Sequence, residues 1–351
     1  MYSITKCVRD VAPLQLLKSR RHPEVSYVNR KLLSFAIKFA VSAILLWLLA
    51  RGIDIDAVGR QMAGADPLWL IIAVFLAAAV IPMAAIRWQM VTQAIREPVS
   101  TRDAMSITTI GWFFNQTLPS TIGGDAVRVY LAYRTGITKT GAIHGILLDR
   151  LMGLFVVLAL ATIFLAPLLA GLDVDFQKWF LIAFIVAGYG GYAVLFLVSA
   201  GFATRLDNIR LGKLLRDLSR AARATLLSLS PGGIILVISV VLQIVQIASV
   251  YAIAVAVGVE VGFTAIMIAL PAVLLVSSLP ISLAGWGVRE QSMVLALGAM
   301  GMGSTDALAI SVLLGLSWIV IGLPGALVWL GHRRRGEHLG QAVEASATSA
   351  D

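Results

Sequence analysis

Six long apolar runs constrain the fold of this chain more than any other feature. They lie at about 32–50, 68–86, 142–170, 179–200, 231–257 and 306–330. A helix needs about 20 apolar residues to cross a ~30 Å hydrocarbon core. A membrane β-barrel would instead show short segments of alternating polarity. The runs therefore predict an all-α polytopic membrane protein.

The composition agrees with this prediction and excludes other classes. Apolar residues make up 59% of the chain and charged residues 13%, whereas soluble domains average about 45–50% and about 25%. The net charge is +9, and the basic residues lie mostly between the apolar runs. This placement indicates membrane topology rather than a nucleic-acid partner. One cysteine excludes an internal disulfide, and four histidines show no metal-ligand spacing. We expect no cofactor and no metal.

Two further apolar stretches, 104–135 and 263–302, are broken near their middles by proline, glycine and charged residues. If each stretch returns to the side it entered, every segment rich in Lys and Arg lies on one side of the membrane. If each crosses once, the six basic residues of 201–230 fall outside, against the positive-inside rule. We therefore predict six full spans plus two re-entrant helical hairpins, the first entering from the cytoplasm and the second from outside.

This topology predicts a multi-pass protein of the inner (plasma) membrane with both termini in the cytoplasm. Residues 1–31 form a basic N-terminal tail, residues 32–330 the transmembrane domain, and residues 331–351 a C-terminal tail.

The two broken stretches resemble each other. Residues 118–128 read LPSTIGGDAVR and residues 279–289 read LPISLAGWGVR, with Pro, Gly and Arg in register. The three full spans between them invert the second copy relative to the first. An inverted-topology repeat with interrupted segments in matching positions indicates a transport site near the membrane midplane.

The residues at the breaks suit an anion site. Prolines end helices and glycines allow sharp turns, and the predicted backbone breaks are Pro119, Gly123, Gly124, Pro280, Gly285 and Gly287. The half-helices that follow have free N–H groups at their N-termini, and the guanidinium groups of Arg128 and Arg289 are suited to hold a lipid phosphate. The alternative is structural: Asp125 and Arg128 as a helical ion pair, and Arg289 with Glu290 as markers of the membrane surface.

Asp149 and Arg150 are a further pair of ionisable residues, early in the run 142–170. Such residues inside a span are costly and often functional. The alternative is an interfacial pair, if the span begins at Leu151.

The segments FFNQTLPSTIGGDAVRVYLAYRTG, LLDRLMGL and LPISLAGWGVRE, with Arg87–Trp88, resemble the lysylphosphatidylglycerol synthase transmembrane (flippase-like) family over about 31–331. The resemblance implies movement of a lipid between leaflets. Full-length members carry a soluble aminoacyl-transferase domain after the membrane part. We expect this chain to be a stand-alone member without that domain, so lipid aminoacylation cannot be inferred from the resemblance. Position 284 departs from the family pattern, with Ala for Gly. The expected substrate-binding residues are Arg87, Asn115, Asp125, Arg128, Asp149, Arg150, Arg289 and Glu290.

Three functions stay open at this point. The first is a translocase for an anionic phospholipid or a polyprenyl-phosphate-type lipid. The second is a glycosyltransferase acting on a polyprenyl-phosphate carrier, with a divalent ion held by Asp54 and Asp56 or by Asp173 and Asp175. The third is an accessory subunit of envelope-lipid synthesis. The expected partners are membrane lipids, with lipid-synthesis enzymes and a second copy of the chain as further candidates.

Overall fold

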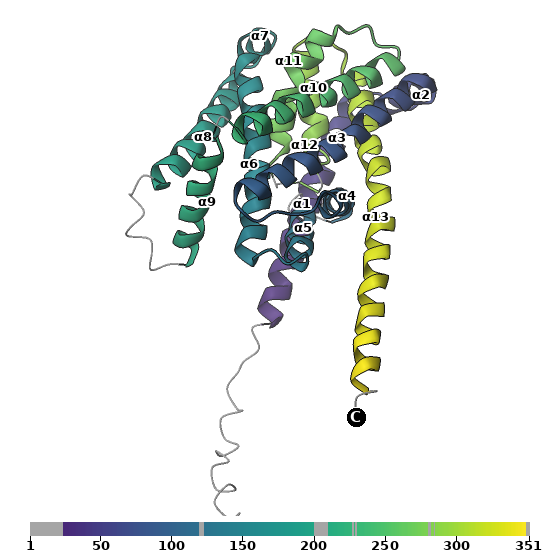
Figure 1. Ribbon diagram of the computed structural model, residues 1–351. Coiled ribbons are helices and arrows are strands. Elements are labelled where there is room, and N and C mark those ends of the chain that lie inside the picture. Colours follow the sequence, from purple (N-terminus) through teal and green to yellow (C-terminus); the bar gives the residue numbers. More distant parts are fainter. Residues whose placement is uncertain are drawn as a thin grey trace, which may run out of the picture.

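The computed structural model describes residues 24–118, 123–199, 210–226, 228, 230–279, 282–283 and 285–348. Within these ranges the chain forms thirteen helices and no strand (Figure 1). The helices are α1 (Glu24–Gly52), α2 (Ile55–Ala63), α3 (Pro67–Ala94), α4 (Thr101–Thr117), α5 (Gly123–Arg134), α6 (Lys139–Ile163), α7 (Leu165–Ala170), α8 (Asp175–Ser199), α9 (Arg210–Leu226), α10 (Gly232–Ala256), α11 (Phe263–Ser277), α12 (Val288–Gly298) and α13 (Ser304–Thr348).

The predicted apolar runs all fall on helices. Five helices in the described part are long and apolar enough to cross a membrane: α3, α6, α8, α10 and the part of α13 up to Gly331. A sixth span results if the segments Ala36–Gly52 and Ile55–Ala63, bent by 90°, count as one. The all-helical membrane protein predicted from the sequence is therefore confirmed, with five or six candidate spans.

The run 142–170 is two helices rather than one. α6 ends at Ile163 and the short α7 follows. Pro167 explains the break, because it has no N–H to donate to the carbonyl of Ile163 and its ring would clash with that carbonyl. α6 begins at Lys139, so Asp149 and Arg150 lie well inside the helix rather than before it.

Each broken stretch forms two helices that pack against each other: α4 with α5, and α11 with α12. Figure 1 shows the first pair in the half of the bundle where α1 begins and α13 ends, and the second pair in the other half. Pro119 and Pro280 lie outside the described residues, so the structure does not test their predicted role.

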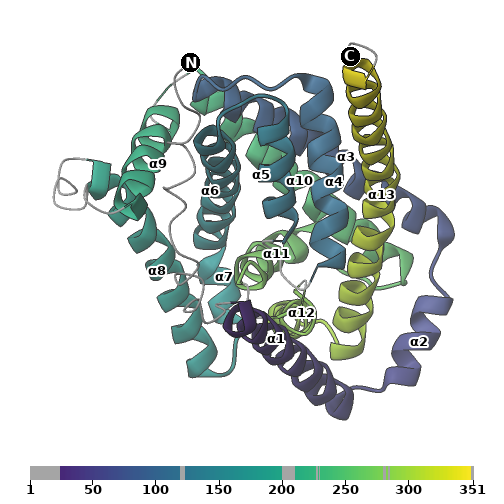
Figure 2. The same cartoon turned by 90° about the horizontal axis from the view of Figure 1, so that it is seen from below.

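Two further helices lie between the predicted apolar runs. α2 lies within 51–67 and α9 within 201–230. α9 is strongly amphipathic: Leu218 and Ala222 are buried, while Arg220 and Arg223 are exposed. Figure 2 shows α9 beside α6 and α8 at the edge of the bundle, and all three are in contact.

The centre of the bundle is held by close helix contacts. α3 and α10 pack along each other, and the hydroxyl of the buried Ser249 on α10 donates to the carbonyl of Ala73 at 2.9 Å. α13 packs against α4 at Gly325, where an added Cβ would overlap the carbonyl oxygen of Thr109 and lie 2.8 Å from the Cβ of Phe113. This contact joins the first broken element to the last span.

Replacing Gly325 with alanine is expected to destabilise the protein by about 1–3 kcal/mol, because α13 must move away from the backbone of α4. Gly331→Ala is the matched control on the same helix, since a Cβ there meets nothing within 4 Å. Thermal unfolding in detergent measures the difference. Equal midpoints for the two variants would show that this contact is not tight.

Candidate functional site

Five charged side chains from three helices gather inside the bundle. We call them the charge cluster, and they are Arg87 of α3, Asp125 and Arg128 of α5, and Asp149 and Arg150 of α6. All five are among the residues that the sequence singled out. Charges in a membrane bundle are costly unless they are paired, so their arrangement specifies how the three helices meet.

Asp149 is the centre of the charge cluster. It is 3% exposed, and its carboxylate accepts a hydrogen bond from Arg87 Nε at 2.8 Å. The two terminal nitrogens of Arg128 approach its other oxygen at 3.3 and 3.4 Å. Arg87 also donates to Ser239 Oγ of α10 at 3.2 Å. One carboxylate thus joins α3, α5 and α6, and Arg87 extends the connection to α10.

The charge cluster reaches the surface at Arg150. Arg150 Nε donates to Asp125 Oδ2, and Asp125 Oδ1 lies 3.7 Å from Arg128 Nη1. The side chain of Arg150 is 46% exposed and that of Asp125 is 12% exposed. Three guanidinium groups and two carboxylates leave a formal charge of +1 on the cluster, with the exposed cation at its edge.

Glycine and tryptophan residues position Arg128. Its aliphatic stem lies on Gly111 of α4, where a Cβ would be only 2.6 Å from Arg128 Cδ. Its guanidinium carbon lies 5.1 Å from the centre of the Trp88 ring, a cation–π geometry. Gly124 packs against Asn115, where an added Cβ would lie 2.6 Å from Asn115 Cγ. Gly111, which was not among the residues expected from the sequence, is therefore needed for the site.

Several buried polar atoms near the charge cluster have no hydrogen-bond partner within the described part of the chain. They are Arg128 Nε, Asp125 Oδ1, Asn115 Oδ1 and Trp88 Nε1. Buried polar atoms are nearly always bonded. The site therefore has unused donors and acceptors beside a net positive charge.

The second broken element holds a different ion pair. Arg289 is 1% exposed and Glu290 is fully buried, and Arg289 Nη2 donates to Glu290 Oε1 at 2.5 Å. The guanidinium lies 4.7 Å from the Trp286 ring and 5.2 Å from the Trp318 ring. This pair is thus enclosed by aromatic rings, in contrast to the half-open charge cluster.

Glu290 also shapes the start of α12. Its Oε2 accepts the backbone N–H of Gly287 at 2.6 Å, and Ser311 Oγ lies 3.3 Å from Oε1. Gly285 and Gly287 have φ values of 88° and 87°, in the region that favours glycine. The chain therefore turns at these two glycines, shortly before α12 begins.

A serine on α1, which was not expected from the sequence to have a role, holds the same break. Ser42 Oγ donates to the carbonyl of Trp286 at 3.0 Å and accepts from the N–H of Leu283 at 2.9 Å. A hydroxyl inside a span is the signal that would have suggested such a role.

The two arginines of the repeat have separate environments, and no contact between them occurs in the described residues. Trp112, next to Gly111 on α4, meets Trp318 of α13 edge-to-face at 6.4 Å. Trp318 in turn lies against Arg289. A pair of indoles therefore links the two elements, and the two arginines predicted to hold a lipid phosphate lie in different surroundings.

The model of the lysylphosphatidylglycerol synthase TM region matches residues 35–325. The chain belongs to this family. The match confirms the resemblance expected from the sequence motifs, and its range includes the charge cluster and the Arg289–Glu290 pair. No curated protein matches the chain.

In this member of the lysylphosphatidylglycerol synthase TM family, one residue of each acidic pair considered for metal binding, Asp54 and Asp175, lies at the start of a helix and near a basic side chain. Asp54 accepts the N–H of Ala57 at 2.9 Å at the start of α2 and lies 3.7 Å from Arg60. Asp175 begins α8 and lies 3.8 Å from Lys178. These contacts give the glycosyltransferase hypothesis no support.

Proposed function

We propose that this protein is a lipid translocase that moves an anionic phospholipid or a polyprenyl-phosphate-type lipid between the leaflets of the plasma membrane. The observation that carries the proposal is the charge cluster. It combines buried guanidinium groups, a formal charge of +1 and one exposed edge at Arg150. Membership of the lysylphosphatidylglycerol synthase TM family supports it.

The distances within the cluster suggest how a phosphate binds. Arg87 and Asp149 are 2.8 Å apart, whereas Arg128 and Asp149 are 3.3 Å apart. Charge-assisted N–H···O bonds are typically about 2.7–2.9 Å long, so Asp149 holds Arg87 more closely than Arg128. A lipid phosphate enters past Arg150 and takes the place of Asp149 at the guanidinium of Arg128, while Asp149 stays with Arg87.

In this proposal the two broken elements are re-entrant hairpins of an inverted repeat, and both termini are cytoplasmic. The packing of α4 on α5 and of α11 on α12, in opposite halves of the bundle, supports this arrangement. Rocking of the halves would alternate access to the headgroup site. The enclosed Arg289–Glu290 pair then holds α12 in position, and Arg128 contacts the lipid. The chain binds and moves its lipid without changing it chemically.

Exchange of labelled lipids in proteoliposomes tests the proposal. We expect the wild-type protein alone to speed the exchange of anionic lipids, with phosphatidylglycerol and a polyprenyl phosphate assayed separately. Arg128→Gln should lower the rate at least tenfold, because the neutral amide loses the charge-assisted contact to phosphate.

Arg102→Gln is the matched control, since Arg102 is exposed at the start of α4. Equal exchange by Arg128→Gln and wild type would contradict the proposal. No exchange by the purified wild type would favour an accessory subunit that acts with a lipid-synthesis enzyme.

A further inference from the structure

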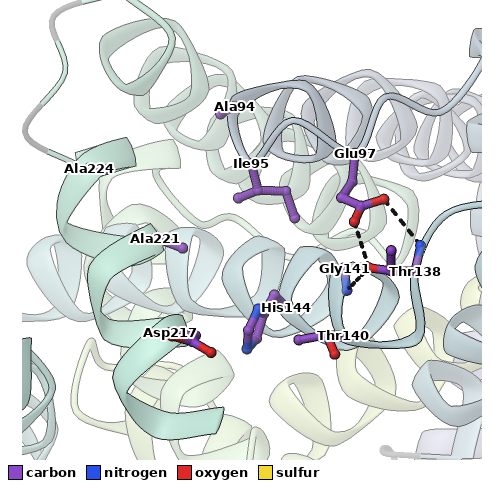
Figure 3. A pocket seen from close by; sticks show the side chains of 10 residues that line it. All are labelled: Ala94, Ile95, Glu97, Thr138, Thr140, Gly141, His144, Asp217, Ala221 and Ala224. Atoms are coloured by element: carbon purple, nitrogen blue, oxygen red, sulfur yellow. Dashed lines mark hydrogen bonds between the residues drawn. The ribbon is translucent and has the colours of Figure 1, made fainter. Parts of the chain in front are cut away.

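A pocket with three ionisable side chains, Glu97, His144 and Asp217, lies between the end of α3, the start of α6 and α9. Its volume is about 310 Å³, and Figure 3 shows the side chains that line it. His144, at its centre, precedes Asp149 by more than one turn of α6, and none of the charge-cluster residues lines the pocket. The pocket is therefore separate from the proposed lipid site.

His144 is the first sign that the pocket takes a ligand. The residue is 7% exposed, yet its Nε2 has no hydrogen-bond partner in the part of the chain that the structure describes. Figure 3 shows the ring in the pocket, between Asp217 of α9 and the start of α6. A buried ring nitrogen without a partner is costly, and a ligand that donates a hydrogen bond would remove that cost.

Glu97 is a carboxylate fixed at the rim of the pocket. The end of α3 turns through Arg96, whose φ is 62°, and the N–H of Glu97 returns to the carbonyl of Thr92 at 2.9 Å. This is the Schellman pattern of a helix end. Glu97 then accepts from the N–H and the hydroxyl of Thr138 at 3.1 and 2.5 Å.

Asp217 supplies a second carboxylate from α9. It is exposed and lines the pocket opposite Glu97. No ion pair is found for either carboxylate within the described ranges. The pocket therefore has a formal charge of −2 in a chain whose net charge is +9.

We propose that this pocket binds a primary ammonium group. An ammonium has one positive charge and three N–H donors, which match two carboxylates and the Nε2 of His144. The volume is at the lower end of the range for small-molecule sites, about 300–1,000 Å³. The ligand is a small soluble amine or the ammonium of a lipid headgroup. Its binding connects α9 to α6, the helix that carries Asp149.

Calorimetric titration of the full-length protein with putrescine, in uncharged dodecyl maltoside micelles, tests the soluble source. Nanodiscs with and without phosphatidylethanolamine test the lipid source through the unfolding temperature. We expect saturable binding of putrescine, or a higher unfolding temperature with phosphatidylethanolamine. Asp217→Asn should raise the dissociation constant for putrescine at least tenfold, or remove most of the increase in unfolding temperature. His144→Phe should also weaken binding or reduce that increase.

Asp217 is exposed, so its substitution leaves the fold intact. Asp175→Asn is the matched control, since the side chain of Asp175 is 88% exposed and it lies on α8, outside the pocket. Binding that is equal in Asp217→Asn and Asp175→Asn would overturn the inference, as would the absence of both effects in wild type. Neither result bears on lipid exchange, because this pocket and the charge cluster share no residue.

Discussion

Replacing Asp149 with asparagine is expected to lower the free energy of unfolding by about 3–5 kcal/mol, the usual cost of breaking a buried ion pair. Asp149 is 3% exposed and is the carboxylate that both Arg87 and Arg128 contact. The neutral amide leaves two guanidinium groups buried with too little negative charge. Thermal unfolding in detergent measures the loss.

Two further variants show whether charge is the cause. Asp175→Asn removes a carboxylate whose side chain is 88% exposed, so it should change the midpoint little. The double variant Arg87→Gln/Asp149→Asn removes one charge of each sign. It should therefore be more stable than the sum of the single effects predicts. An Asp149→Asn midpoint equal to that of wild type would show that the cluster needs no central carboxylate.

Replacing Glu290 with glutamine is the second substitution that we expect to lower the stability of the protein strongly. Glu290 is the carboxylate beside Arg289, and both are almost completely buried. The amide can still accept the N–H of Gly287, but it leaves the guanidinium between Trp286 and Trp318 without a counter-charge. We expect the free energy of unfolding to fall by about 3–5 kcal/mol. The tryptophan fluorescence should change as well, because the contacts of the guanidinium with the two rings loosen.

Glu260→Gln provides the comparison, because Glu260 is exposed at the end of the bundle. It should leave both the midpoint and the fluorescence unchanged. If Glu290→Gln behaves like Glu260→Gln, then water reaches Arg289 and the enclosed pair described above is not dry.

The sequence predicted the apolar helices because the requirement of a membrane is local: a run of about 20 apolar residues can cross as a helix whatever its neighbours are. The helices α2 and α9 were not predicted, because neither is long and apolar. The spacing of Leu218 and Ala222 on one face and Arg220 and Arg223 on the other is a helical signal that could have identified α9. Pro167 likewise marks the end of α6.

The site residues could be selected from the sequence, but their pairing could not. Asp149 contacts Arg87 across 62 positions of the chain, a contact that only the packing of α3 on α6 creates. The repeat made Arg128 and Arg289 look equivalent. They differ because Glu290 follows Arg289 directly, whereas Val129 follows Arg128. Arg128 therefore takes its carboxylates from Asp125, one turn earlier on α5, and from Asp149 on α6.

The hydroxyl of Ser42 holds both sides of the turn before α12. That turn lies more than two hundred residues downstream, so the conformation of the second motif depends on the first helix of the chain. Shortened versions of this protein prepared for crystallisation or reconstitution should therefore retain α1, although the charge cluster and both broken elements lie beyond it.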